Sequence, residues 1–516
     1  MFCVFHLFRY CATFQLIDGI CAAPLLRPGT LSKSVTHKTW FIDGREESPS
    51  GASQSFYAAT NTTETGIMSI AVPGQIRGLV KLHELTGNNL AWKKLFTEAI
   101  ALAKDGFVVN QRFIDDLELY RNEIERNREL RLLFRPGQLE VGSMLKQSKM
   151  AQTLTKLASD ARQDYFYQKE FATEWHRELS DIGSLIKLTD ILNYEARKLP
   201  TLNITLEDEL MLVTAPPPTT GAITAAICGI VKQKYSDHPP NDDASFYHVL
   251  TEAFKFGFGR RSVFGDYDFT DAENLADMMD PEYLKVLADR IRDNGVLPSY
   301  SEYYLHHDKA PPEQHYAIKS LSGGAVPIII WAPNGDVVAL ITSLNSMLGS
   351  QIISEKYGII YNNVMNDFDL SQQPNVWGFP GSLSSNILAP SRRPVTSLAP
   401  AFVFHKGALV AIAAGVGGGF AITGIAQVVL RNLMFSRSPK DAIDWYRIHH
   451  QLMPNTLFIE DRMDIGQQAY LRFRSHDVQS LPHWGGTVVA VTQKDGRIYA
   501  TYDFRDNSLS DTIVGE

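Results

Sequence analysis

Hydrophobic and polar positions follow a helical period through the first half of the chain. In residues 77–106 apolar side chains recur at Leu79, Leu82 and Leu85, and the run ends near a glycine, which predicts a helix. Residues 112–134 are dense in interspersed Arg and Glu, which predicts a solvated helix face and not a binding patch. Three more segments have helical or apolar character: 166–192, 222–231 and 244–258.

The second half of the chain changes to strands separated by strong turn signals. Residues 325–331 form a continuous apolar run, and the Asn334-Gly335 turn leads into a second run at 337–344. This hairpin is largely apolar on both faces, so we expect it to lie between two layers of a core. The other expected elements are a strand or strand pair at 402–414, a helix at 422–435 and a last hairpin of strands 487–491 and 498–502. Helices and strands in this mix predict a layered α/β sandwich.

The composition is that of an ordinary globular protein. The 516 residues carry 49 Lys and Arg against 57 Asp and Glu, a formal net charge of −8. No long basic run occurs, which argues against a nucleic-acid partner, because phosphate binding needs a clustered cationic face. Four cysteines without a C-x-x-C pair are too few for a disulfide scaffold and supply no zinc motif. The sequence therefore implies neither a metal nor an organic cofactor.

Two segments have the apolar character of a targeting or membrane element. Residues 1–26 are apolar and aromatic, but charged side chains interrupt them, so they form either a poor export signal or a buried element. Residues 407–429 are uncharged, yet six glycines within them favour a strand, a turn and a helix over a membrane span. No membrane anchor is evident in the sequence.

Familiar catalytic templates are missing from the sequence, including the G-x-S-x-G elbow, the H-E-x-x-H metal site and the phosphate-binding loop. The glycines at 415–419 lack the spacing of a dinucleotide-binding loop. His449 and His450 are adjacent, but adjacent positions on a helix face different directions and no third ligand is evident. A structural role for these two histidines is therefore favoured over a metal site.

Seven segments, in one order along the chain, match the motifs of a known family. Residues 71–78 are Ala-Val-Pro-Gly-Gln-Ile-Arg-Gly, close to the family's V-P-G-E-I-R-G, and residues 449–455 follow its H-x-Q-L-x-P-N. The other five segments are 43–49, 215–221, 358–368, 396–400 and 415–423. From about residue 32 to its C-terminus the sequence therefore resembles the gamma-glutamyltransferases, or glutathione hydrolases, which are N-terminal nucleophile hydrolases.

The resemblance implies a fold and a division of the chain into two subunit-like parts. The family has a four-layer αββα sandwich, an α/β (α+β) architecture. A large-subunit-like part is expected over residues 32–324 and a small-subunit-like part over 325–516, both within one intertwined domain. Residues 1–31 match nothing in the family and form a separate N-terminal segment.

The resemblance also implies roles for particular residues. In the family, self-cleavage before a threonine frees an amino group that acts as base for the threonine hydroxyl. An acyl enzyme then forms with the γ-glutamyl group, and two backbone N–H groups stabilise the oxyanion. Those N–H groups are assigned to Gly418 and Gly419, and the substrate carboxylate to Arg45, whose guanidinium fork fits a carboxylate. The residues expected to hold the two ends of the substrate are Asn345, Asp367, Thr396 and Ser397. Without the motifs, Arg45 is explained as a surface ion pair, and Thr396 and Ser397 as caps of a turn.

The sequence departs from the family at the position of the nucleophile, where the family pattern is G-T-[TS]-H-x-S. Counting back from Asn345 through the Asn334-Gly335 turn places the nucleophile at Ala325, which has no hydroxyl group. Pro327 and Ile329 stand where the pattern has His and Ser. Val364 replaces a family glutamate that contacts the substrate amino group.

These observations predict a glutathione hydrolase-like protein of glutathione metabolism that has lost catalysis, stays one uncleaved chain and still binds glutathione or another γ-glutamyl compound. One alternative is a working glutathione hydrolase or transpeptidase; Ser322 as its nucleophile is disfavoured, because a shift of three residues breaks the strand register with Asn345. The other alternative is a secreted interaction or decoy protein. By resemblance the protein lies outside the cell or on the outer face of the plasma membrane. Two Asn-x-Thr sequons, at Asn61 and Asn203, fit a secreted glycoprotein.

Overall fold

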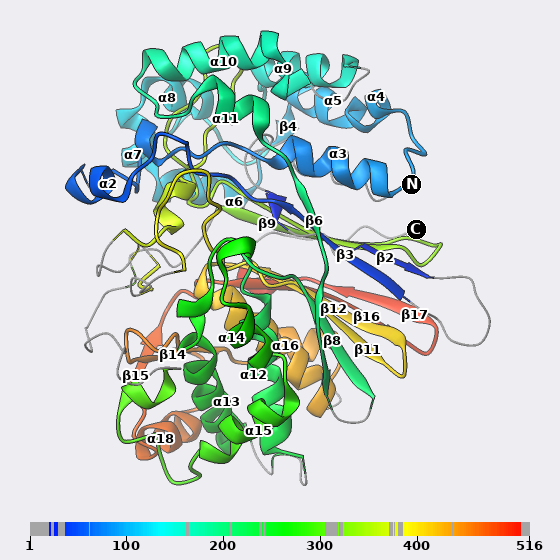
Figure 1. Cartoon of the computed structure of the whole chain (residues 1–516), viewed down its shortest axis with the longest axis vertical. Coiled ribbons are helices and arrows are strands. Elements are labelled where there is room, and N and C mark those ends of the chain that lie inside the picture. The colour runs from blue at the N-terminus through cyan, green and yellow to red at the C-terminus, as the bar shows by residue number, and fades with distance from the viewer. Residues whose placement is uncertain are drawn as a thin grey trace.

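The computed structural model of the chain describes residues 20–21, 25–28, 37–60, 62–160, 165–206, 209–236, 240, 243–304, 318, 324–370, 375, 377–379, 385–435 and 437–506. Its elements stack in four layers, with a layer of helices on the outer face of each of two sheets (Figure 1). The four-layer αββα sandwich expected from the sequence is therefore confirmed. Each sheet combines strands from both sides of residue 325, and the division at that residue stays a prediction.

The first sheet contains the apolar hairpin that the sequence predicts. Its described strands are β1 (Ile20–Cys21), β2 (Leu25–Pro28), β3 (His37–Gly44), β6 (Arg197–Leu199), β9 (Ala325–Trp331) and β10 (Val337–Ser343). β9 pairs antiparallel with β10 over its whole length, from Trp331 opposite Val337 to Ala325 opposite Ser343. Every residue of β10 is buried, because helices cover one face of this sheet and the second sheet covers the other.

The second sheet is antiparallel, with its described strands in the order β17-β16-β12-β11-β8-β7. These strands are β7 (Leu202–Leu206), β8 (Leu210–Thr214), β11 (Ala401–His405), β12 (Ala408–Val416), β16 (Thr487–Lys494) and β17 (Arg497–Thr501). An apolar cluster fills the space between the sheets: Val213, Val337, Ala339, Phe402, Phe404, Leu409 and Ile412. Burying a side chain of the size of valine or phenylalanine contributes about 1.5–3 kcal/mol, so this layer joins the two halves of the sandwich strongly.

Helices of the first half of the chain cover the first sheet. They are α3 (Gln75–Leu85), α4 (Trp92–Leu95), α5 (Thr97–Asp105), α9 (Ser148–Ser159), α10 (Lys169–Asp181) and α11 (Leu188–Asn193). Their apolar faces meet Ile42 of β3 and Val338 and Leu340 of β10 in one core. Beside them, a smaller core lies under α6 (Gln111–Leu119), α7 (Arg121–Arg126), α8 (Arg128–Phe134) and the strand pair β4 (Phe107–Val108) and β5 (Met144–Leu145). The short helix α2 (Gln54–Thr60) follows β3.

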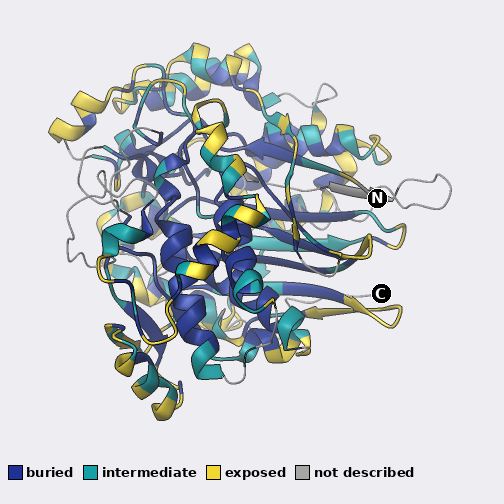
Figure 2. Ribbon diagram, turned by 60° about the horizontal axis from the view of Figure 1, so that its bottom comes forward, coloured by how far each residue is buried: buried dark blue, intermediate teal, exposed yellow. Residues whose placement is uncertain are grey.

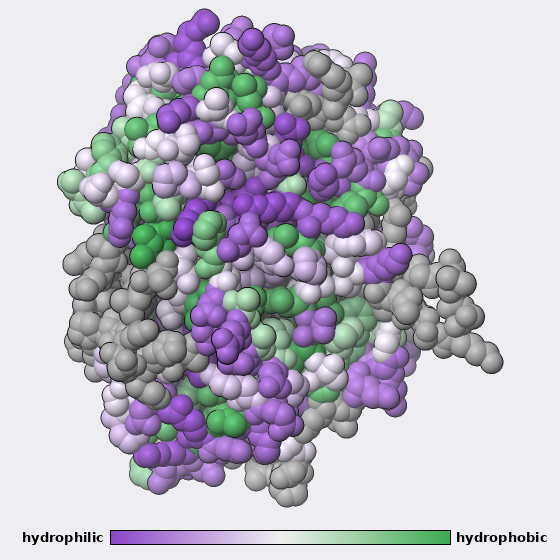
Figure 3. All heavy atoms as spheres, in the orientation of Figure 1, coloured by the Kyte–Doolittle hydropathy of each residue, from purple (hydrophilic) through white to green (hydrophobic). Residues whose placement is uncertain are grey.

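The helices on the second sheet form the largest core. They are α12 (Gly221–Lys234), α13 (Asp243–Phe258), α14 (Ala272–Asp277), α15 (Pro281–Arg290), α16 (Gly419–Met434), α17 (Pro439–Asp444) and α18 (Ile465–Phe473). Long stretches of α12, α13 and α16 are buried, and Figure 2 shows the buried helices at the centre of this layer. A Cβ at Gly229 of α12 would lie 2.3 Å from Leu284 Cδ1, so glycine permits the close packing of α12 on α15. On the face seen in Figure 3, hydrophilic residues cover most of the coloured surface and hydrophobic ones lie in small groups.

Several predicted long helices are broken in the structure. The run 77–106 contains three helices, because Gly87 and Asn88 adopt positive φ angles of 85° and 52° that end the helical path. The run 112–134 is also three helices, and the side chain of Asn127 starts the last one by accepting the backbone N–H groups of Glu129 and Leu130. In both runs the helical period is right, but local backbone breaks that the period does not reveal divide each run into shorter helices.

His449 was expected on a helix, and this expectation is wrong. Residues Ile448–His449 form strand β13, which pairs with β14 (Leu457–Glu460), and β14 pairs in parallel with β15 (Val478–Leu481). His449 is buried; Thr423 Oγ1 lies 2.9 Å from its Nδ1 and Gln451 Oε1 lies 3.0 Å from its Nε2. Burial lowers the pKa of His449 to about 3, so the ring is neutral at physiological pH. Two hydrogen-bond partners and a neutral ring give this histidine a structural role.

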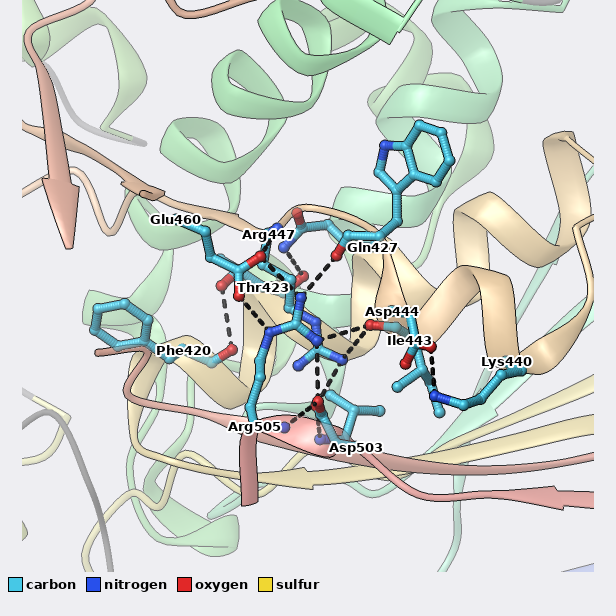
Figure 4. A network of polar contacts seen from close by, with 12 residues as sticks. Phe420, Thr423, Gln427, Lys440, Ile443, Asp444, Arg447, Glu460, Asp503 and Arg505 are labelled. Carbon is cyan, nitrogen blue, oxygen red and sulfur yellow. Dashed lines mark hydrogen bonds and ion pairs between the residues drawn. The ribbon is translucent and has the colours of Figure 1, made fainter. Parts of the chain in front are cut away.

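Four buried charged residues fasten the end of the described chain, and we call them the C-terminal ion cluster: Arg447, Glu460, Asp503 and Arg505 (Figure 4). Arg447 Nη2 lies 2.8 Å from Asp503 Oδ2, and Arg505 Nη1 lies 2.9 Å from Asp503 Oδ1. Arg505 also donates to Glu460 and to the carbonyl oxygens of Ile443 and Trp445. The cluster therefore joins the segment after β17 to α17 and β14.

Within the described residues, the structure has no helix that is long and apolar enough to cross a membrane. Residues 407–429, the uncharged stretch, are divided between β12 and α16, as the glycines indicate. Most of the unmatched segment 1–31, together with Ser322 and the sequon residue Asn61, lies outside the described residues.

Candidate functional site

A small hollow of about 40 Å³ opens between the two sheets, next to the start of β9. Its lining residues are Ala325, Ser343, Asn345, Asp367, Trp377, Thr396, Ser397, Leu398, Val416, Gly417, Gly418 and Ala421. Six of the eight residues singled out from the sequence are among them, although they lie up to 93 positions apart in the chain. The other two, Arg45 and Gly419, lie just behind the lining. This volume holds a few water molecules, so a larger ligand needs the hollow to widen.

Ala325 lies at the edge of the hollow, at the first position of β9. The carbonyl oxygen of the preceding residue, Gly324, accepts the N–H of Leu344 at 3.0 Å and the hydroxyl of Ser343 at 3.1 Å. The N–H of Gly324 donates to the carbonyl of Asn345 at 2.9 Å. These bonds extend the β9–β10 register, which is the register used to place the nucleophile position at residue 325. The assignment of Ala325 to the nucleophile position stays a prediction from the sequence.

The glycine turn between β12 and α16 lies at the hollow, which Gly417 and Gly418 line. Gly417 and Gly418 have φ angles of 116° and 60°, and α16 begins at Gly419. A Cβ at Gly417 would lie 2.2 Å from the carbonyl oxygen of Gly485, and one at Gly418 would lie 2.8 Å from the ring of Trp377. Glycine is thus required by both conformation and space. The first N–H groups of a helix have no partner within it, so this turn is suited to a negatively charged oxygen.

Arg45 lies behind the hollow and is tied to two carboxylates; we call Arg45, Glu46 and Asp367 the pocket ion cluster. Its Nη1 donates to Glu46 Oε2 at 3.1 Å, its Nη2 donates to Asp367 Oδ2, and its Nε donates to the carbonyl of Pro394 at 3.2 Å. Arg45 is only 2% exposed. The surface ion pair considered from the sequence is therefore wrong, because the pair is buried and faces the hollow through Asp367.

Asp367 connects this cluster to the hollow. Its Oδ1 accepts the indole N–H of Trp377 at 2.8 Å, and its backbone carbonyl accepts the side-chain amide of Asn386 at 2.8 Å. The carboxylate is thus fixed from two sides, by Arg45 and by Trp377. A carboxylate held in this way at the edge of a hollow is suited to a ligand ammonium group.

Thr396 and Ser397 are positioned by the proline-rich segment 215–221. The N–H of Thr396 donates to the carbonyl of Pro218 at 2.9 Å, and Thr396 forms a parallel bridge with Thr219. The N–H of Thr220 donates to the carbonyl of Leu398 at 3.1 Å. These bonds hold residues 396–398 in extended form, so the cap of a turn considered for Thr396 and Ser397 is not what the structure has.

Asn345 and the Asn-Asn pair of segment 358–368 have mainly backbone partners. The Asn345 side chain donates to the carbonyl of Asn363 at 3.2 Å, and its φ angle is 77°. Asn362 bonds both the N–H and the carbonyl of Ala71, each at 3.0 Å. Asn363 accepts the N–H of Ser346 at 2.9 Å. The matched segments therefore clamp one another around the hollow.

Among the residues of the site that were not singled out from the sequence, three make contacts that matter here: Trp377, Ser343 and Glu46. Trp377 covers Gly418 and holds Asp367, but nothing in its neighbours along the chain indicates this. Ser343 was used only to count the register. Glu46 lies inside the matched segment 43–49, but the sequence does not reveal that its side chain is completely buried. Burial raises the pKa of Glu46 to about 7 against the opposing charge of Arg45.

No group of three or more His, Cys, Asp or Glu side chains in the described part of the chain is arranged to hold a metal ion. His450, beside His449, accepts the N–H of Leu452 on its Nδ1 at 3.0 Å. Burial lowers its pKa well below the usual value, as for His449. The absence of a cofactor stays a prediction from the sequence.

Comparison with known proteins connects this site to a family. A profile of the gamma-glutamyltranspeptidase family matches residues 30–511. Scoloptoxin SSD14 from Scolopendra dehaani is 28% identical over 478 residues, covering 90% of this chain and 80% of that protein. The glutathione hydrolase proenzyme of Escherichia coli is 27% identical over 502 residues, covering 94% and 83%.

The fold has a close counterpart among solved structures. A cephalosporin acylase from Bacillus halodurans superposes with a TM-score of 0.80 at 18% identity, covering 97% of this chain and 90% of that one. The four layers are those of the N-terminal nucleophile hydrolases. With the family profile spanning nearly the whole sequence, the chain belongs to the gamma-glutamyltranspeptidase family.

Proposed function

We propose that this protein binds glutathione or a related γ-glutamyl compound in the hollow beside β9 and does not hydrolyse it. The observation that carries the proposal is Ala325, which occupies the first position of β9, directly opposite Ser343. An alanine methyl group can attack neither the carbonyl of Gly324 nor the γ-glutamyl amide. The chain is then a single uncleaved polypeptide without an acyl-enzyme step.

The hydroxyl that lies beside Ala325 is not equipped to replace the missing one. Ser343 lies beside Ala325, but its hydroxyl donates to Gly324 O and accepts the N–H of Asn345 at 2.8 Å. A serine hydroxyl is a weak nucleophile unless a base takes its proton. In the family, that base is the amino group freed by cleavage, and Ala325 cannot free one. Ser322 lies outside the described residues and stays the disfavoured candidate.

The binding half of the site supports the other part of the proposal. Asp367 offers a carboxylate to an α-ammonium group, while Gly418 and Gly419 offer backbone N–H groups to a carbonyl oxygen. Thr396 and Ser397 line the same hollow with hydroxyl groups. Val364 is fully buried and apolar, so Asp367 is the ammonium partner that we assign. Donors and acceptors for an amino-acid head group thus remain without the nucleophile.

The test combines three measurements on the purified full-length chain. We expect one band on a denaturing gel, no release of nitroaniline from γ-glutamyl-p-nitroanilide, and saturable heat on titration with glutathione. The E. coli glutathione hydrolase serves as the positive control for cleavage and turnover. Two fragments divided before Ala325, or sustained heat after each injection, would overturn the loss of catalysis. Absence of heat at millimolar glutathione would overturn the binding.

A third possibility, a protein that acts through its outer surface, has one observation in its favour. One of the relatives is named a scoloptoxin, while others are named glutathione hydrolases. A surface-acting protein would keep its fold and its partner regardless of γ-glutamyl ligands. The glutathione titration distinguishes the two functions, because only the pocket-binding protein gives saturable heat.

We further propose that the chain works outside the cell. Asn203 and Thr205 of one sequon are both exposed on β7, the outermost strand of the second sheet in the described chain, and are thus accessible to a glycan. Expression through a secretory pathway is expected to yield a glycan that an endoglycosidase removes and that Asn203→Gln abolishes. Secreted protein with an unmodified Asn203 would contradict the glycan.

A further inference from the structure

Glu46 has an unusual environment for a carboxylate. It is fully buried, and among the described residues Oε1 has no hydrogen-bond partner. The side-chain donor to its other oxygen is Nη1 of Arg45, at 3.1 Å. Burial without adequate donors favours the neutral form of an acid, since an isolated charge is costly in a protein interior.

The groups that face Glu46 carry more negative than positive charge. Arg45 is shared between Glu46 and Asp367, and Asp43 adds a third carboxylate nearby. Asp43 has its own partner in Arg393, whose Nη1 lies 2.7 Å from Asp43 Oδ2. Glu46 and Asp367 are therefore bonded to the same guanidinium, and the buried Arg261 adds a charge interaction to Asp367 but none to Glu46. This shortage of positive charge is a property of the site before any ligand arrives.

Binding of an amino-acid head group changes which charged groups are paired with Arg45 and Asp367. Its carboxylate needs the Arg45 guanidinium, and its ammonium group needs a carboxylate. Asp367 keeps the indole N–H of Trp377 as a donor when Arg45 turns to the ligand, so Asp367 suits the ammonium group. Glu46 loses its side-chain donor in the same event, and no neutralising cation replaces it. The charges then pair completely only if Glu46 is neutral.

We propose that Glu46 accepts a proton from solvent when an amino-acid head group binds at Arg45 and Asp367, so that the pocket takes up one proton for each ligand it holds. Glu46 is thus a positioning residue: it releases Arg45 to the ligand carboxylate by becoming neutral on its unpartnered oxygen. The inference rests on the proposed function, since it needs a ligand with both a carboxylate and an ammonium group.

The experiment is calorimetric titration of the full-length chain with S-methylglutathione, in buffers of different ionisation enthalpy. The dependence of the heat on the buffer gives the number of protons taken up. The pKa of Glu46 is raised to about 7 in the ligand-free protein, so uptake is expected near one proton at about pH 8 and near none at about pH 5. By linkage, the dissociation constant increases about tenfold for each pH unit above about 7.

Glu46→Gln keeps the shape of the side chain and cannot gain a proton. We expect this variant to bind without proton uptake and with a dissociation constant that is the same at about pH 6 and pH 8. Glu84→Gln on the surface of α3 is the matched control, and it is expected to take up the same number of protons as the wild type. The 50% exposed Glu84 side chain pairs with Lys81, at 3.2 Å.

The outcomes separate the two claims. Binding of the wild-type chain without proton uptake at about pH 8 overturns this inference and leaves the proposed function standing. Uptake that persists in Glu46→Gln assigns the proton elsewhere and overturns it as well. Absence of binding at every pH overturns the proposed function and this inference together. Circular dichroism of the variant establishes that it is folded, and a wild-type titration alone still decides whether a proton is taken up.

Discussion

Two buried ion clusters in this molecule are built from the same residue types but differ in their balance of charge. In the C-terminal ion cluster two buried arginine side chains face two carboxylates, and Arg505 bonds both Glu460 and Asp503. The partly exposed Arg462 adds a third cation, which pairs with Glu460 at 3.1 Å. In the pocket ion cluster one arginine serves two carboxylates. A cluster with at least one cation for each carboxylate needs no further charge, and it fastens one segment of the chain to another. A cluster with fewer cations than carboxylates can accept the positive charge of a ligand.

The pKa values of the buried carboxylates in the two clusters follow the number of cations that face them. Burial acts to raise the pKa of Asp503, but the facing charges of Arg447 and Arg505 outweigh it, and the pKa lies below its usual value. Burial raises the pKa of Glu46, and Arg45 does not compensate. Similar burial thus gives opposite results, depending on how many cations face each carboxylate. Three substitutions test this comparison, and a fourth tests the position of Ala325.

Arg505→Ala is expected to have the largest effect. It removes the side chain that bonds Glu460, Asp503 and two backbone carbonyls, so buried carboxylates lose a cation. We expect the free energy of unfolding to fall by about 3–5 kcal/mol in chemical denaturation. Lys494→Ala, at an exposed position of β16, is the control and changes stability by less than about 0.5 kcal/mol. A loss below about 1 kcal/mol for Arg505→Ala would contradict a fastening role.

Glu46→Gln is expected to change how stability depends on pH. The pKa of Glu46 is about 7 in the folded chain against 4.5 as the reference for an unfolded one. The stabilisation from its bound proton is therefore fully present below about pH 4.5 and is lost as the pH rises through about 7. The difference in unfolding free energy between wild type and variant should decrease by about 3 kcal/mol across that window. Equal slopes for both proteins would place the Glu46 pKa near its ordinary value.

Asp367→Asn is expected to weaken ligand binding. It removes the charge that we assign to the ligand ammonium group and keeps the shape of the side chain. A hydrogen bond to a charged group contributes about 1.5–3 kcal/mol, so the affinity for glutathione should fall about ten- to a hundredfold in calorimetry. Asp268→Asn, whose side chain is 67% exposed, is the control. Unchanged affinity in Asp367→Asn would move the binding site away from this hollow.

Ala325→Thr is expected to have the smallest effect on stability. Residue 325 borders the hollow, so the added atoms have space, and we expect a change below about 1 kcal/mol. The chain should remain uncleaved on a denaturing gel, because Pro327 and Ile329 lack the hydrogen-bonding side chains of the family pattern. Cleavage before residue 325 would show that the hydroxyl alone is missing.

The sequence was informative wherever structure depends on neighbours in the chain. β9 is found at the predicted residues, 325–331, because an apolar run followed by an Asn-Gly turn is a local signal. The helices of 77–106 were predicted as one, since positive φ angles at Gly87 and Asn88 follow from contacts as well as from residue type. The resemblance supplied the fold, which periodicity alone gave only as a layered sandwich.

For the candidate site, too, the sequence was informative about single residues but not about contacts between distant segments. Its residues could be named from matched segments, and six of them line one hollow. The pairing of Arg45 with Asp367 could not be predicted, because it joins positions 322 residues apart. Neither could the cover that Trp377 places over Gly418, which depends on the path of a loop. The sequence names the side chains of the site, while their pairing is a property of the assembled layers.

The clamps between matched segments have a consequence for how the chain folds. Arg45 bonds Pro394 across 349 residues, and Ala71 bonds Asn362 across 291. Contacts this distant form slowly, since the chain between them must first be ordered. The hollow is complete only when these distant segments have met, so a ligand recognises only the folded chain. At a concentration a hundred times its dissociation constant, such a ligand adds about 2.7 kcal/mol to the stability of the folded state. Supply of the ligand would then lower the unfolded fraction of the protein about a hundredfold.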